Sequence, residues 1–245
     1  MADGGQGCAK LEVMVGVTHP SELDAVEEMY GRIIDAMIGT PFDILWRRGE
    51  HPSREMLEDE AATGNLFVAK DEAARADAQP MGAFVLNGRQ TSGYESVPWT
   101  VMAEPSEVCV IHSLAVDPKA QGHGVSQVLL AAAALEARRR GARALRLDVV
   151  PYNEPGIACY RAFGMHDLGI HKLVYDGFEP LPFRMFELGL KSEFEHAGTI
   201  VSGPVTPSGA FSDKVSCKTA GGRRRLVRKR STRLGEEDGV SCAPD

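Results

Sequence analysis

The chain has 245 residues, of which 43% are hydrophobic and 25% charged, a balance typical of a globular protein that buries one core. No apolar stretch approaches the roughly 18 to 20 residues that a membrane span needs, and the amino terminus lacks the basic and then apolar plan of a secretory signal. We therefore expect a cytoplasmic protein with one main domain and no membrane partner.

The net charge of -7 is unevenly distributed along the chain. Residues 191–245 carry 10 Lys and Arg against 7 Asp and Glu, whereas residues 1–190 carry 17 against 27. An acidic body favours a cationic partner such as an amine and argues against nucleic acid as the partner of the main domain. The five cysteines are scattered and form no C-x-x-C, so we expect neither a disulfide framework nor a metal site.

The first elements follow from hydrophobic spacing and capping signals. Residues 11–17 are rich in β-branched side chains and predict a strand. Ser21 and Asp24 resemble a capping box at the start of a helix whose apolar positions recur with helical spacing through Met37. Ser53 is expected to cap a second, shorter helix that ends near Gly64.

The middle of the chain has the strongest pattern. Residues 65–70 and 81–87 predict two strands of a hairpin. A strand at 108–116 is followed by a Gly-containing turn, a helix at 125–140 and a strand at 144–150. Because a helical crossover joins them, the last two strands should be parallel. The remaining expected elements are a helix at 154–163 and closing strands near 165–175 and 183–190.

The two ends of the chain differ in character from this body. Residues 1–9 are expected to be a flexible amino terminus, and residues 10–190 to form the domain. Residues 191–245 are rich in Gly, Ser, Thr and Pro without apolar periodicity, which predicts a disordered tail. The tail contains a basic run at Arg223–Arg230, which suits nucleic acid, acidic lipid or an acidic partner, or else is only a solvated face.

The segment Val116–Ser126, V-D-P-K-A-Q-G-H-G-V-S, lies between an expected strand and an expected helix. Gly122 and Gly124 allow the backbone to turn tightly and present its N–H groups at the amino end of the helix. Such an end carries about half a positive charge and can bind a diphosphate. The segment is not a Walker motif, because no Gly-Lys-Ser/Thr follows, and Gln127 replaces the third glycine of a dinucleotide fingerprint.

Two segments carry a family resemblance. Leu114–Ser126 resembles the acyl-CoA diphosphate motif of the GNAT superfamily of N-acetyltransferases, and Arg146–Met165 is similar to its second motif. Ser126 stands where Gly or Ala is usual, and Met165 where Phe is usual. The resemblance implies an α/β (α+β) GNAT fold: a mixed central sheet of about six to seven strands with a splayed parallel pair, flanked by about four helices.

The resemblance also implies acetyl-CoA as co-substrate and a set of residues that bind it. Tyr160 would protonate the departing thiolate, and Asn153 would hydrogen-bond the pantetheine or the acceptor, or simply cap its helix. The side chain of His123 is expected to be a solvated loop residue rather than a catalytic one. The residues expected to bind the pantetheine and the diphosphate are Leu114, Ala115, Val116, Gln121, Gly122, His123, Gly124, Val125 and Ser126.

The identity of the general base is left open by the sequence. His112 corresponds to a histidine that serves as base in a member of the family, and its ordinary pKa suits the task. Strand alternation places it on the same face as Leu114 and Val116, so a buried structural histidine competes with this role. Glu107 and Asp148 are the other candidates.

The expected reaction is acetyl transfer to a primary amine by direct attack in a ternary complex, with a backbone N–H of Ala115 or Val116 stabilising the oxyanion. The acceptor is a small amine, an antibiotic or a protein amine. The alternative is a non-catalytic acyl-CoA-binding sensor of the same fold, and a homodimer is possible. Cys109 and Cys159 suggest a covalent route, although buried cysteines are more often structural. Candidates for the acceptor wall are Phe42, Trp46, Tyr94 and Trp99.

Overall fold

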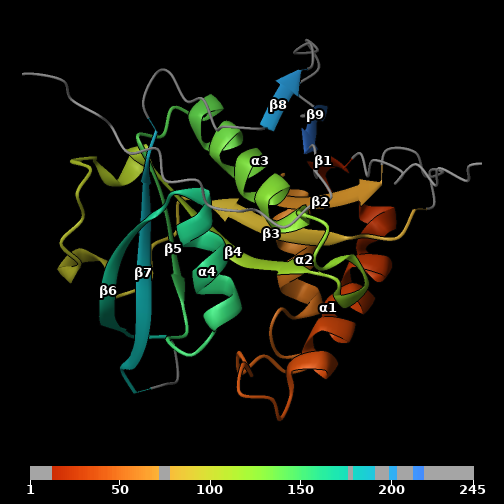
Figure 1. The fold of residues 1–245 in the computed structure, drawn as a ribbon, viewed down its shortest axis with the longest axis horizontal. Helices are drawn as coiled ribbons and strands as arrows, with labels where there is room; N and C mark the ends of the chain where they lie inside the picture. The colour runs from red at the N-terminus through yellow and green to blue at the C-terminus, as the bar shows by residue number, and fades with distance from the viewer. Residues whose placement is uncertain (1–12, 72–77, 176–178, 191–198, 203–211, 218–245) are drawn as a thin grey trace, which may run out of the picture.

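The structure, a computed structural model, describes residues 13–71, 78–175, 179–190, 199–202 and 212–217. Within these ranges nine strands form one sheet in the order β6-β7-β5-β4-β3-β2-β1-β9-β8 (Figure 1). The strands are β1 (Val13–Val17), β2 (Leu66–Asp71), β3 (Gly82–Asn87), β4 (Val108–Val116), β5 (Ala144–Val149), β6 (His166–Leu173), β7 (Leu181–Gly189), β8 (Thr199–Ser202) and β9 (Ser212–Cys217).

The strand pairing confirms the expected topology. β2 and β3 form the predicted antiparallel hairpin, and β4 and β5 are the predicted parallel pair. The other neighbouring strands are antiparallel. Seven strands come from residues 10–190, as expected, while β8 and β9 lie in the region after Leu190 where the sequence predicted no regular structure. The basic run and the first nine residues lie outside the described residues.

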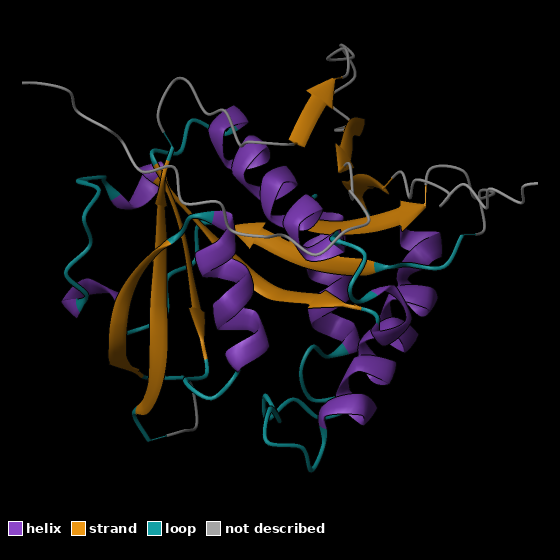
Figure 2. Cartoon of the chain, viewed as in Figure 1, coloured by secondary structure: helices purple, strands orange, loops and turns teal. Residues whose placement is uncertain are grey.

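Four α-helices cover the two faces of the sheet (Figure 2). Apolar side chains of α3 (Val125–Arg139) and α4 (Glu154–Phe163) pack in one cluster with alternate residues of the central strands. Those of α1 (Leu23–Met37) and α2 (Arg54–Ala62) pack on the opposite face. Among the described residues, none of these helices combines the length and apolar character needed to cross a bilayer.

Of the two capping signals predicted from the sequence, one is present in the structure and the other lies two residues earlier. The Ser53 side chain accepts from the Met56 N–H at 3.2 Å, which confirms the predicted cap of α2. The capping box predicted at Ser21 was wrong, because it forms at His19 instead: the His19 ring accepts from the Ser21 N–H, and the Glu22 carboxylate accepts from the His19 N–H. A short 3-10 turn therefore precedes α1.

A buried ion pair between β5 and β7 holds the long connection between β3 and β4 in place. Arg146 on β5 donates to Glu187 on β7 at 3.1 Å, and their side chains are 5% and 1% exposed. The second oxygen of Glu187 accepts from the Thr100 and Val101 N–H groups and the Thr100 hydroxyl. The Trp99 ring lies over the Arg146 guanidinium at 4.1 Å. The connection is therefore held by charge-assisted bonds rather than by apolar contact alone.

Replacing Glu187 by Ala should lower the free energy of unfolding by about 3–5 kcal/mol, because Arg146 would be left charged and unpaired in the interior. Urea denaturation checks this value. Arg161→Ala is the matched control, because the Arg161–Asp167 pair has its arginine 52% exposed and such pairs contribute less than about 1 kcal/mol. Equal losses in the two variants would contradict the prediction.

Candidate active site

The central strands diverge next to a bulge in β4. Pairing between β4 and β5 covers three positions, Val108–Val110 against Ala144–Arg146, and then ends. On its other side β4 gains one residue relative to β3, because Ala83 lies opposite Ala115 but Val85 lies opposite His112. Ser113, inside this bulge, has φ +50°. The second half of β4 therefore presents an edge toward β5 with no strand beside it.

The turn before α3 presents free backbone donors. Gly122 and Gly124 both have φ +80°, a region that favours glycine. Among the described residues, no side chain and no carbonyl outside the turn accepts from the backbone N–H groups of Gly122 to Ser126. These donors at the positive end of a fifteen-residue helix match a diphosphate in charge. This part of the chain therefore fits the diphosphate of acetyl-CoA without a cationic side chain.

An ion pair anchors that turn to α1. The Arg32 guanidinium donates to Asp117 Oδ2 through Nε at 2.9 Å and Nη2 at 2.6 Å. The other carboxylate oxygen of Asp117 accepts from the Lys119 N–H at 2.9 Å, and the backbone carbonyl of Asp117 accepts from the Ala120 N–H. The Gln121 side chain folds back to donate to the Val116 carbonyl at 3.3 Å. The turn is thus fixed by its own residues and by Arg32 of α1.

Tyr160 lies on α4, its ring packed on Phe186 at 5.4 Å between centroids. Burial raises the pKa of Tyr160, and the nearby Cys159 and Asp148 add to the shift, so the hydroxyl is protonated at neutral pH. Among the described residues this hydroxyl has no hydrogen-bond partner, and it is not completely shielded from solvent. It therefore reaches accessible space as a proton donor.

Asn153 caps α4, as one of its two expected roles requires. Its Oδ1 accepts from the Gly156 N–H at 3.1 Å. A Cβ added at Gly156 would lie 2.9 Å from Asn153 Nδ2, so the cap and the glycine fit each other closely. The Nδ2 donor takes no part in the cap. Asn153 can consequently cap the helix and still donate to a ligand.

His112 is on the opposite face from the one that alternation predicted. Its Nε2 lies 3.1 Å from Asn87 Oδ1, and Asn87 in turn donates to Glu60 of α2. Leu114 and Val116 pack on the other face, with α3. The prediction failed because the bulge adds one residue and shifts the alternation. Burial, and secondarily the charge of Arg89, lower the pKa of His112 to about 4.

The two carboxylate candidates lie in different environments. Asp148 on β5 is partly buried, and its two oxygens accept from the Tyr94 hydroxyl at 2.7 Å and the Tyr175 hydroxyl at 2.8 Å. Burial raises the pKa of Asp148. Glu107 lies at the start of β4, where the strands are paired, and forms an ion pair with Arg143 at 3.3 Å. Glu107 is therefore too near the closed end of the pair to reach a group in the gap.

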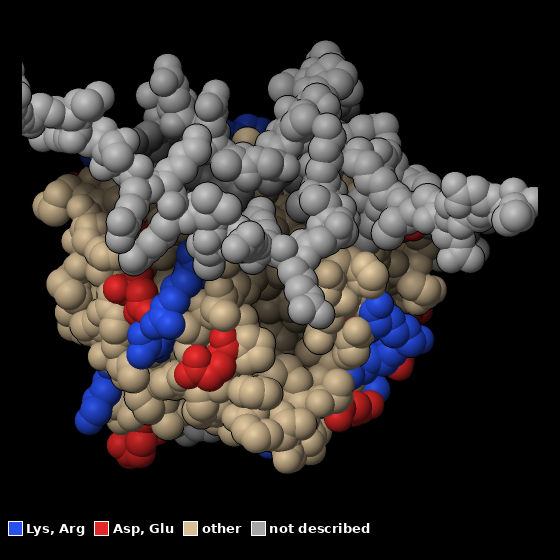
Figure 3. Space-filling model, viewed as in Figure 1, with Lys and Arg blue, Asp and Glu red and all other residues tan. Residues whose placement is uncertain are grey.

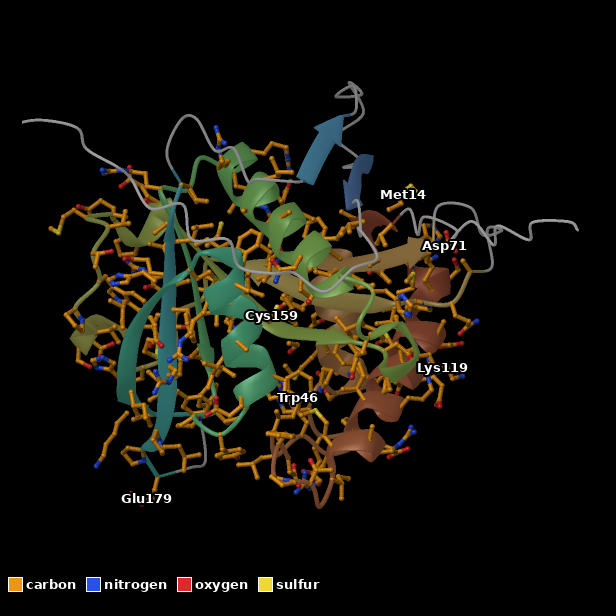
Figure 4. The ribbon with its side chains drawn as sticks, viewed as in Figure 1. Met14, Trp46, Asp71, Lys119, Cys159 and Glu179 are labelled. Carbon is orange, nitrogen blue, oxygen red and sulfur yellow. The ribbon has the colours of Figure 1, made fainter. Side chains whose placement is uncertain are left out.

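The four aromatic candidates divide between two places. Trp99 donates its indole N–H to the Tyr94 carbonyl. Both rings belong to the apolar cluster that packs against Arg146. Trp46 follows α1, and in the view of Figure 4 it lies between α4 and α1. Phe42, on the same loop, is 38% exposed. Figure 3 shows a hollow near the middle of this face with a largely uncharged described rim. Phe42 and Trp46 thus remain candidates for the acceptor wall.

Cys109 and Cys159 are poor nucleophiles. Burial raises the pKa of Cys109 and of Cys159, so both are thiols at neutral pH. Gln127 of α3 donates to Cys159 Sγ at 3.3 Å, which ties α3 to α4. This environment disfavours a covalent acetyl-cysteine. In the described ranges no three His, Cys, Asp or Glu side chains are grouped as metal ligands would be.

Three residues at the bulge were not singled out by the sequence. The Tyr30 hydroxyl donates to the Ser113 carbonyl at 2.7 Å, and Ser113 Oγ lies 3.2 Å from His51 Nε2. These residues are far apart in the chain, on α1, on β4 and in the loop before α2. A positive φ at a serine inside an apolar strand has no signal in composition or periodicity, so only the folded chain reveals this cluster.

Comparison with known proteins places the chain among acetyltransferases. Residues 34–165 match the family model described as "Acetyltransferase (GNAT) family". Streptothricin acetyltransferase of Streptomyces lavendulae is 26% identical over 164 residues, which are 64% of this chain and 84% of that protein.

Solved structures agree with the fold. An N-acetyltransferase from Staphylococcus aureus Mu50 is 21% identical, with a TM-score of 0.53 over 73% of this chain and 99% of its own. A GNAT-family acetyltransferase from Streptococcus agalactiae 2603 is 16% identical, with a TM-score of 0.54 over 74% of this chain and 96% of its own. At these identities the likeness concerns the fold alone.

Replacing Gly122 by Ala should weaken acetyl-CoA binding about tenfold, because a Cβ at positive φ is disfavoured by roughly 1–2 kcal/mol and the turn would leave the conformation that exposes its amides. Titration calorimetry with acetyl-CoA measures the change. Gly141→Ala is matched to it: Gly141 has φ +81°, and an added Cβ meets nothing within 4 Å at either glycine. Gly141 lies beyond the other end of α3, so that variant should bind normally, and weakening in both would contradict the assignment.

Proposed function

The chain belongs to the GNAT family of acetyltransferases, and from this premise we propose that it transfers the acetyl group of acetyl-CoA to a primary amine by direct attack within a ternary complex. The observation that carries the proposal is the combination of the amides at Gly122–Ser126, which have no partner outside their turn, with the unpaired edge of β4. The first would bind the diphosphate, and the second would accept the pantetheine as a substitute strand. Together they would direct the thioester into the gap.

Residues of the gap then supply the chemistry. The amine nitrogen attacks the thioester carbon, and the negative charge that develops on the oxygen is stabilised by a backbone N–H of Ala115 or Val116. Tyr160 donates its proton to the sulfur as the carbon–sulfur bond breaks. Support for this role comes from its accessible, unpaired and protonated hydroxyl. The raised thiol pKa values of Cys109 and Cys159 favour direct transfer over a covalent intermediate.

For the acceptor we propose a small cationic amine of the antibiotic class, with streptothricin as the first compound to assay. The support is the streptothricin acetyltransferase relative, together with the excess of acidic residues in the first 190 positions. An acidic surface raises the local concentration of a cation and accelerates its association. The wall formed by Phe42 and Trp46 offers apolar area beside it.

The proposed function is tested by following free thiol release from acetyl-CoA with a panel of amines that includes streptothricin, lysine peptides and aryl alkylamines. We expect streptothricin to accelerate thiol release over the background hydrolysis. A chain that binds acetyl-CoA by calorimetry while no amine accelerates release would instead be an acyl-CoA-binding sensor, the second candidate for this fold. A chain that binds no acetyl-CoA would contradict both.

Tyr160→Phe should lower kcat by roughly 10²-fold or more while acetyl-CoA affinity stays within a factor of about two, because only the proton for the thiolate is removed. The ring keeps its contact with Phe186, so folding should be unaffected. Steady-state kinetics with streptothricin measure the rate, and calorimetry with acetyl-CoA is the control. Unchanged turnover would remove Tyr160 from the mechanism.

A further inference from the structure

A histidine outside the family motifs, His51, lies against the bulge of β4. It stands two residues before the Ser53 cap of α2. Its Nε2 is 3.2 Å from Ser113 Oγ. Ser113 comes three residues after Val110, the last residue of β4 that pairs with β5. The imidazole and the hydroxyl therefore meet where the gap between the strands begins.

Aromatic side chains hold this pair in place. The Trp46 ring lies 5.1 Å from the His51 ring and 6.0 Å from the Tyr30 ring, measured between centroids. The Tyr30 hydroxyl fixes the Ser113 carbonyl at 2.7 Å. Among the described residues, His51 Nδ1 has no hydrogen-bond partner, and the residue is only partly buried. One ring nitrogen thus contacts Ser113, and the other is left for a proton.

The surroundings keep the imidazole neutral. Burial lowers the pKa of His51 below its ordinary value of 6.5. The titratable groups that face it are His112 on β4, whose pKa is lowered to about 4, and Tyr30 on α1, whose pKa burial raises. All three are uncharged at pH 7. A neutral imidazole has a free lone pair, so His51 can accept a proton over the physiological range.

We propose that His51 is the general base of the reaction and takes the proton of the acceptor amine through the Ser113 hydroxyl. This rests on the proposed acetyl transfer. The ammonium of the acceptor passes one proton to Ser113 Oγ, while the Ser113 proton moves to His51 Nε2. The imidazolium then releases one proton to water and returns to the tautomer in which the Nε2 lone pair is free.

The remaining bonds balance with Tyr160. The freed nitrogen forms a bond to the thioester carbon, and the carbon–sulfur bond breaks with its electron pair on sulfur. Tyr160 protonates that sulfur and is restored by the second proton that the nitrogen loses. The sum is an amide, free CoA and one proton released to solvent. No oxidant, reductant or additional reactant is needed.

His112 is less suited to the same task. Its Nε2 is already in contact with Asn87 Oδ1, and a pKa of about 4 makes it a weak base. Asn87 is held by Glu60, which pairs with Arg89. His112 thus belongs to a buried polar network that joins β3, β4 and α2. In this assignment His112 positions the bulge, and His51 accepts the proton of the acceptor amine.

The test compares His51→Gln with His166→Gln, a matched control on the exposed face of β6. Full-length protein is assayed with acetyl-CoA and streptothricin between pH 5 and 9, with acetyl-CoA affinity measured by calorimetry. In the unmodified chain kcat/KM should fall at acid pH, below the ordinary histidine pKa of about 6.5, because burial lowers the pKa of His51 and the imidazole is protonated only there. In His51→Gln that fall should disappear, and kcat/KM at pH 7 should be roughly 10²-fold lower.

A second readout separates a base from a structural residue. As pH rises toward the pKa of the amine, solvent deprotonates the acceptor, so the deficit of His51→Gln should shrink steadily. A deficit that stays constant with pH, or a wild-type profile in His51→Gln, would overturn the role of His51 and leave the proposed function standing. Full activity in Ser113→Ala would overturn the relay through the hydroxyl. No turnover of any amine by the unmodified chain would overturn the proposed function and this inference together.

Discussion

The loss of pairing between β4 and β5 is the constraint on which the rest of the site depends. A parallel pair in the middle of a sheet normally satisfies the backbone of both strands, and a dry, unpaired amide costs about 1–3 kcal/mol. Here pairing ends after Val110 and Arg146, so the backbone groups beyond that protein side chains do not reach are left for water or an extended ligand. The pantetheine arm, with its own amides, has the chemistry to replace the missing strand.

Two sets of contacts keep the strands from closing. On β4 the conformation of Ser113 is disfavoured by roughly 1–2 kcal/mol for a non-glycine residue, and the hydrogen bond from Tyr30 helps to offset that cost. Farther along, Asp117 is fixed to Arg32, so both contacts pull the second half of β4 toward α1. On β5, Arg146 is fixed to Glu187 of β7, on the opposite side. The gap is therefore built by interactions outside it.

The sequence predicted what depends on local chemistry and missed what depends on register. The order of strands and helices and the glycine turn at Gly122 could be inferred, because periodicity and positive-φ residues leave a local signal. The divergence of the strands was known only through the resemblance. The face of His112 was wrong because strict alternation fails at a bulge, and His51 was missed because its partner Ser113 is 62 residues away.

Burial has the same effect on His51, His112 and Tyr160: it favours the uncharged form. It lowers the pKa values of His51 and His112 and raises that of Tyr160, so bases are free and the acid is loaded at the same pH. An ammonium that enters this environment is desolvated in the same way, and its own pKa falls. The amine therefore gives up its proton more readily in this environment than it does in water, before it attacks.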